Sequence, residues 1–188
     1  MNYLVLVNKD NLIKESYFKD LELVECKNDD GDIIKVEKET YSAYLELKNY
    51  LDSINIDVVI GSAFRSIEEQ QKIIDDFTKE HGEEYVKNYV APIRTSEHHT
   101  GLALDLVLLV EEDENLAEGE LPLKERLYRE MHKHLSDYGF ILRYPVGKES
   151  ITGYNYEPWH IRYVGRKVAN YIYHTGLTLE EYVKMERF

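Results

Sequence analysis

Residues 96–105 read S-E-H-H-T-G-L-A-L-D, and they open a strongly apolar run in which Asp105 is the one charged residue. Such a run predicts a buried strand, and a buried carboxylate is costly unless it is paired or bound to a metal. Because side chains alternate along a strand, Gly101, Ala103 and Asp105 share one face, where two small residues leave space above the sheet. A loop that precedes the strand can fold the imidazole of His98 over the Asp105 carboxylate.

The composition excludes several classes of protein. The 188 residues include 23 Lys and Arg against 36 Asp and Glu, a formal net charge of −13. This charge argues against binding to nucleic acid or to an anionic lipid surface, since both need a basic face. Cys26 is the only cysteine, so neither an internal disulfide nor a thiolate metal cluster is expected.

The start of the chain and its apolar runs bear on location. No apolar run approaches the ~20 residues of a membrane span, and residues 1–15 lack the basic and apolar segments of a signal peptide. We therefore expect a cytoplasmic protein if the sequence is full length, and an exported or cell-surface protein if an N-terminal segment has been removed.

Helical and strand patterns alternate irregularly, which predicts an α+β fold with a central, mainly antiparallel sheet flanked by helices. We expect one catalytic domain over residues 1–188, with a strand and hairpin region at 1–40 and a core at 41–188. Asp30-Gly31 between two apolar runs is a hairpin signal. The expected strands cover residues 58–60, 102–110, 140–144 and 159–164. The expected helices cover residues 40–54, 66–89, 122–138, 166–174 and 178–185. Thr40 is expected to cap the first helix, and the second is either continuous or broken at Gly82. Capping-box spacing occurs twice, at Ser66 with Glu69 and at Thr178 with Glu181.

Two further segments carry polar residues at places where the chain must bend. Residues 157–160 read E-P-W-H, and Pro158 holds Glu157 in an extended conformation. A bend there could bring Glu157 and His160 into one cavity, and the alternative is that Glu157 is an ordinary turn acid. Arg65 lies between a buried strand and a helix start, where a guanidinium can bind a carboxylate with two hydrogen bonds.

Together these residues contain the parts of a metallopeptidase. His98, Asp105 and His160 make a three-ligand set for a catalytic zinc and leave a fourth position open. Glu157 can take a proton from water, and Arg65 can bind a substrate carboxylate or balance an oxyanion. The sequence has no H-E-x-x-H helix, so this is not a zincin site.

Other interpretations of these residues remain open at this point. His99 could be the ligand in place of His98, and Asp105 could pair with a core arginine, either Arg143 or Arg162. The remaining histidines are expected to be surface groups or core groups with a hydrogen-bond partner: His81, His132, His134 and His174.

The motifs resemble those of the zinc D-Ala-D-Ala carboxypeptidases of the VanY type. S-x-H-x-x-G-x-A-x-D followed by E-P-W-H is a long ordered signature, with F-R-S at 64–66 and E-E-Q-Q at 68–71 upstream. The similarity extends from about residue 58 to 163. The segments 139–145 and 151–165 look especially like the cytoplasmic VanXY proteins, which combine dipeptidase and carboxypeptidase activity.

The resemblance implies the D,D-peptidase (Hedgehog-like) fold and one zinc ion per chain, on His98, Asp105 and His160. It implies Glu157 as the base and Arg65 near the substrate carbonyl or terminal carboxylate. Gln70 and Ser96 match positions that contact the substrate. The implied reaction is hydrolysis of the peptide bond next to a C-terminal D-alanine in peptidoglycan precursors or stem peptides. An L,D-carboxypeptidase acting on tetrapeptide stems, and a non-catalytic zinc-containing peptidoglycan-binding module, are the alternatives.

Three loops are expected to lie near the substrate. Residues 111–120, an acidic segment whose composition predicts a solvated loop, and residues 148–156 are expected to form the pocket walls. Ile93-Arg94 replaces the small residues that are common before the motif, and there Arg94 could reach the substrate.

Overall fold

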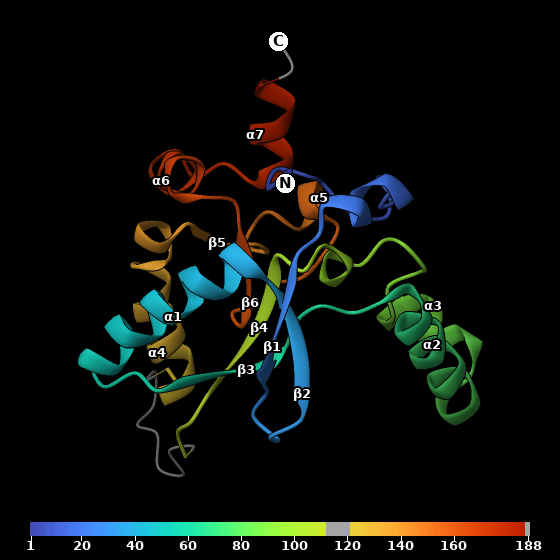
Figure 1. Ribbon diagram of the computed structural model, residues 1–188. Coiled ribbons are helices and arrows are strands. Elements are labelled where there is room, and N and C mark those ends of the chain that lie inside the picture. The colour runs from blue at the N-terminus through green and yellow to red at the C-terminus, as the bar shows by residue number, and fades with distance from the viewer. Residues whose placement is uncertain (112–120, 187–188) are drawn as a thin grey trace.

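A four-stranded antiparallel sheet forms the centre of the computed structural model, which describes residues 1–111 and 121–186 (Figure 1). Its strands lie in the order β3 (Val58–Ser62), β4 (Ala103–Leu108), β6 (His160–Tyr163) and β5 (Phe140–Leu142). A separate antiparallel hairpin joins β1 (Leu23–Lys27) to β2 (Ile33–Glu37). The predicted α+β class, the antiparallel sheet and the hairpin at Asp30-Gly31 are confirmed.

Helices flank the sheet on several sides. In the described residues they are α1 (Lys38–Ser53), α2 (Ile67–His81), α3 (Glu83–Tyr89), α4 (Leu123–His132), α5 (Glu149–Thr152), α6 (Arg166–Thr175) and α7 (Leu179–Met185), with 3-10 turns η1 (Glu15–Asp20), η2 (Glu97–Thr100) and η3 (Leu135–Tyr138). Figure 1 places α1 and α4 at one side of the sheet and α2 with α3 at the other. None of the helices described is both long and apolar enough to cross a membrane.

One face of the sheet packs on α1 and forms the main core. Leu104 and Leu106 of β4 are buried there together with Leu47 and Leu51 of α1. Because side chains alternate, Asp105 points to the opposite face. Asp105 of β4 is paired directly with His160 of β6, so two chemically active side chains lie next to each other on the face away from α1.

Both predicted capping boxes are present, at the start of α2 and of α7. The start of α1 differs, because Glu37 and not Thr40 is the cap. The Glu37 carboxylate accepts hydrogen bonds from the backbone N–H and the hydroxyl of Thr40, both at 2.8 Å. A carboxylate at a helix N-terminus is also favoured by the helix dipole.

The predicted helix over 122–138 is wrong as a single element. It ends at His132, and the chain then tightens into η3, which keeps Leu135 buried. Gly139 ends that turn with a φ of 85°, a conformation that glycine adopts without steric cost.

The other long segments resolve as follows. Helix 66–89 is broken at Gly82, the second of the two alternatives. The loop 148–156 contains the short helix α5. Most of the predicted acidic loop, residues 112–120, lies outside the described residues. The division into a region at 1–40 and a core at 41–188 stays a prediction.

Arg94 holds a left-handed backbone, with a φ of 67°. Its guanidinium pairs with Glu15 of η1, and its carbonyl accepts a 2.9 Å hydrogen bond from the N–H of Ile13. The segment before the S-E-H-H motif is therefore tied to the N-terminal region, and the Arg94 side chain is directed to Glu15.

Arg94→Gly is expected to be more stable than Arg94→Ala by about 1 kcal/mol, because an L side chain in left-handed backbone costs roughly that much. Both variants lose the ion pair with Glu15, so their difference in urea unfolding isolates the backbone. Lys72 is an exposed position in the middle of α2, and there the order of stability should reverse: Lys72→Ala should be more stable than Lys72→Gly by about 1 kcal/mol. Equal stability of the two Arg94 variants would contradict this account.

Candidate active site

His98 is held with one ring nitrogen facing Asp105. The Ser96 hydroxyl caps η2 by accepting a hydrogen bond from the His98 N–H at 3.3 Å. The His98 Nδ1 lies 2.7 Å from the carbonyl oxygen of Ala63 and must donate its hydrogen there. In the neutral ring, Nε2 then carries the lone pair, and it lies 3.2 Å from Asp105 Oδ2.

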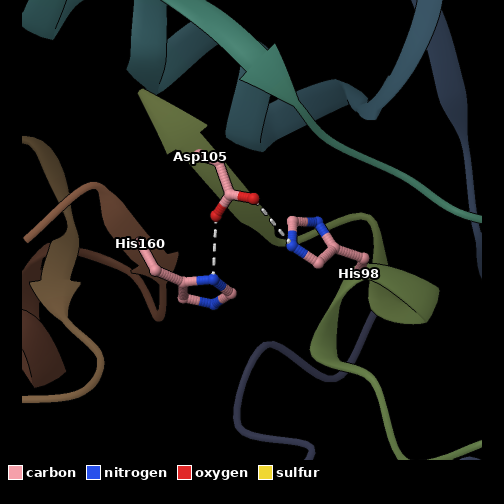
Figure 2. A group of neighbouring side chains, drawn as sticks. All are labelled: His98, Asp105 and His160. Atoms are coloured by element: carbon pink, nitrogen blue, oxygen red, sulfur yellow. Dashed lines mark ion pairs between the residues drawn. The ribbon is translucent and has the colours of Figure 1, made fainter. Parts of the chain in front are cut away.

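His160 approaches the other oxygen of the same carboxylate, as Figure 2 shows. Its Nδ1 lies 2.9 Å from Asp105 Oδ1, while its Nε2 faces Glu97 Oε2 at 3.5 Å. One ligand atom from each of His98, Asp105 and His160 lies within 4.8 Å of the others. The three predicted ligands therefore meet, although they come from η2, β4 and β6.

The chemistry of this set fits a divalent zinc ion. Asp105 Oδ1 is buried, and its partner in the described part of the chain is His160 Nδ1, at 2.9 Å. Burial alone would lower the pKa of His160, but Asp105 and Glu97 more than offset this and raise it to about 9. The two carboxylates therefore stabilise a positive charge at this place. A zinc ion bound by two imidazoles and a carboxylate would supply that charge.

Glu97 belongs to this group of residues and was not anticipated from the sequence. It is fully buried, and its Oε1 accepts hydrogen bonds from Arg143 Nε at 2.7 Å and Arg162 Nη1 at 2.6 Å. Burial opposes its ionisation, but the two guanidinium groups hold the pKa of Glu97 well below its usual range. The suggested pairing of Asp105 with Arg143 or Arg162 is wrong, because both arginines bind Glu97. Two arginines in apolar strand segments were the available signal, since each buried cation requires an acid.

The two adjacent histidines differ in position, because the His98 Nε2 lies 3.2 Å from the Asp105 carboxylate and His99 lies outside that group. His99 is fully buried, and its Nδ1 lies 2.7 Å from the backbone oxygen of Arg65. Its ring supports the junction between β3 and α2 and is not part of the group around Asp105. His98 is the histidine that faces the ligand set.

Arg65 lies beside this set and is oriented by its neighbours. Its Nη1 donates to Gln70 Oε1 at 3.1 Å and its Nη2 to Ser62 Oγ at 3.4 Å. Burial lowers the pKa of Arg65, while the Asp105 carboxylate acts in the opposite direction. Gln70 is fully buried and also donates to the Ala91 carbonyl at 2.8 Å. Gln70 therefore orients Arg65, and its direct contact with substrate, like that of Ser96, stays a prediction.

Glu157 stands next to the ligand set without belonging to it. Its Oε2 lies 3.8 Å from His160 Nδ1, and its side chain is half-buried. Burial raises the pKa of Glu157, with the nearby Asp105 adding to the effect and His160 opposing it. A carboxylate with a raised pKa beside a metal site is suited to accept and return a proton.

A cavity of about 370 Å³ shares Ser62 and Asp105 with this group of residues and is lined on its other sides by residues such as Tyr128 and Trp159. This volume falls in the range of sites that hold small ligands. A larger cavity, of about 750 Å³, lies between the N-terminal segment and α7 and contains none of the residues described above.

The VanY family model, described as D-alanyl-D-alanine carboxypeptidase, matches residues 33–166, which include every residue of the site. The chain belongs to the VanY family. It is 35% identical to the D-alanyl-D-alanine carboxypeptidase of Enterococcus faecalis, covering 98% of this chain and 66% of that protein. It is 34% identical to the bifunctional D-Ala-D-Ala dipeptidase and D-Ala-D-Ala carboxypeptidase VanXYC of Enterococcus gallinarum, covering 97% and 94%. The chain thus spans about two thirds of one relative's length and nearly all of the other's.

Solved structures of related proteins share the fold of this VanY-family chain. One is a vancomycin resistance D,D-pentapeptidase VanY in complex with Zn(II), with a TM-score of 0.76, 32% identity, and 97% and 99% of the two chains covered. Another is the LD-carboxypeptidase LdcB, with a TM-score of 0.77, 33% identity, and 95% and 84% covered. The family resemblance is confirmed, and the Zn(II) complex agrees with the zinc predicted for this site.

Proposed function

We propose that this protein is a zinc-dependent peptidase that removes a C-terminal D-alanine from peptidoglycan precursors or stem peptides. The observation that carries the proposal is the meeting of His98, Asp105 and His160 around one point, with the Glu157 carboxylate 3.8 Å from His160 Nδ1. The names of the related proteins support D-Ala-D-Ala as the substrate class.

Each residue of the site has its own role in the proposed hydrolysis. A zinc ion bound by the three ligands supplies a Lewis acid for the scissile carbonyl and lowers the pKa of the attacking water. Glu157 accepts a proton from that water and delivers it to the leaving amine of the terminal D-alanine. Arg65, oriented by Gln70 and Ser62, balances the oxyanion or binds the terminal carboxylate.

An L,D-carboxypeptidase is the second candidate, because LdcB has the same fold at a similar identity. The two activities use the same hydrolytic chemistry and differ in the residue that precedes the bond. A binding module without activity is less well supported, since such a protein has no use for Glu157 beside a complete ligand set.

Product analysis by mass spectrometry separates these functions. The zinc-loaded protein is offered D-Ala-D-Ala, a pentapeptide stem ending in D-Ala-D-Ala, and a tetrapeptide stem ending in one D-Ala. We expect loss of one alanine from the pentapeptide, and none from a matched pentapeptide that ends in L-Ala. Cleavage of the tetrapeptide alone would assign an L,D-carboxypeptidase, and three intact substrates would contradict the enzyme proposal.

A further inference from the structure

The base-bearing segment, residues 157–160, is a tight turn with Pro158 in its second position. The His160 N–H donates to the Glu157 carbonyl at 3.1 Å. The Trp159 carbonyl accepts from the Leu106 N–H of β4 at 3.0 Å. Backbone bonds thus account for the carbonyls of Glu157 and Trp159, and proline at this position favours the turn.

A side chain from a distant helix binds the Pro158 carbonyl, while the His160 carbonyl accepts from the Arg143 N–H at 3.2 Å. His132, in the last turn of α4, places its Nε2 at 2.8 Å from the Pro158 oxygen. A carbonyl only accepts, so this contact requires the Nε2–H form of the ring. Burial lowers the pKa of His132, which favours the neutral imidazole. The ring also stacks on Tyr128, one turn earlier in α4, with an interplanar angle of 22°.

The carboxylate of Glu157 is held only weakly by its neighbours among the described residues. Among the described residues no hydrogen bond reaches it, and its ion-pair contact is with His160 Nδ1 at 3.8 Å. Its position therefore depends on the backbone that carries it. That backbone is held by β4 at Trp159, by the Tyr144 carbonyl, which accepts from the Glu157 N–H at 3.3 Å, and by His132 at Pro158.

We propose that His132 is a positioning residue, which holds the turn at residues 157–160 so that Glu157 reaches the attacking water. This inference rests on the proposed role of Glu157 as base. His132 was expected from the sequence to be an ordinary partnered histidine, but its partner is the carbonyl directly after the base. His134, two residues later, faces Tyr50 of α1 at 3.4 Å instead and provides a matched control.

Two substitutions of similar size test the contact. In His132→Gln the amide nitrogen comes near the place of Nε2, whereas in His132→Asn it comes near the place of Nδ1 and falls short of Pro158. We expect His132→Asn to lower kcat by ~10–100-fold, since a misplacement of about 1 Å can cost ~100-fold. KM and the zinc content should stay within ~2-fold of the parent, and His132→Gln should recover most of the lost kcat. His134→Asn should leave kcat unchanged.

Two measurements on the metal-free protein report the same contact without catalysis. The ¹⁵N spectrum of the His132 ring should show the Nε2–H form. Hydrogen exchange at the His160 amide should become faster in His132→Asn and stay unchanged in His134→Asn.

The proposal is overturned if the His132→Asn variant keeps full kcat. It is also overturned if that variant loses zinc or stability together with kcat and the His132→Gln variant shows the same losses. If His132→Asn fails to fold, a Gln variant with normal zinc but low kcat would also overturn it. The proposed function fails separately, if Glu157→Gln is fully active. Loss of activity in Glu157→Gln with a fully active His132→Asn removes only the positioning role.

Discussion

Glu157→Gln is expected to keep its zinc and lose turnover, with kcat lower by ~10²–10⁴-fold. The amide has nearly the shape of the carboxylate, but it cannot take a proton from water. Because the Glu157 oxygen is outside the group of three ligand atoms, the metal should remain bound. The same substitution also removes a negative charge 3.8 Å from His160, so zinc affinity has to be measured together with the rate.

The measurement compares initial rates on a pentapeptide stem with metal analysis of the same preparation. Glu130→Gln serves as the matched control, because Glu130 is on the exposed side of α4 and pairs with Lys133 at 2.5 Å. That control should retain parental activity. Near-normal turnover in Glu157→Gln would remove Glu157 from the reaction and leave the proton transfer to another group.

The meeting of His98, Asp105 and His160 could be predicted because its signals are local. Asp105 is a charge within an apolar strand, and the alternation of side chains places it on a definite face. Pro158 marks a bend, so Glu157 and His160 could be expected to converge. The hairpin at Asp30-Gly31 and the two capping boxes are also local patterns, and all three are present.

The features that the sequence did not reveal depend on residues far apart in the chain. Glu97 pairs with Arg143 and Arg162, which are 46 and 65 positions away, and no spacing rule connects them. The contact between His132 and Pro158 is of the same kind, since it forms only after α4 has packed beside the turn. The preference for His98 over His99 needed the position of each ring relative to Asp105.

The local predictions that were wrong concern places where two nearby residues or two local structures could form and only one does. Thr40 is a good capping residue, but Glu37 lies one turn earlier and its longer side chain takes both donors of Thr40. The helix expected to reach Tyr138 stops at His132 because the following residues form a tighter turn. Such outcomes depend on small energy differences between two acceptable structures, which tertiary packing decides.

Removal of any one of the three ligands is expected to release zinc. His98→Ala and His160→Ala each delete one imidazole, and Asp105→Ala deletes the carboxylate that faces both rings. Loss of a residue that only hydrogen-bonds to a metal ligand costs ~10–100-fold in metal affinity or activity, so loss of a direct ligand should cost more. At equimolar zinc, each variant should carry far less than one ion per chain after gel filtration.

His99→Gln is the control for the zinc measurement, since His99 is next to His98 in the sequence but its ring binds the Arg65 carbonyl. It should keep one zinc ion per chain. Binding to the folded state alone stabilises a protein by mass action, so added zinc should raise the melting temperature of the parent and of His99→Gln. The three ligand variants should show little or no such rise. Full zinc content in all three would mean that the ion binds elsewhere, and Glu157 and Arg65 would then have no metal beside them.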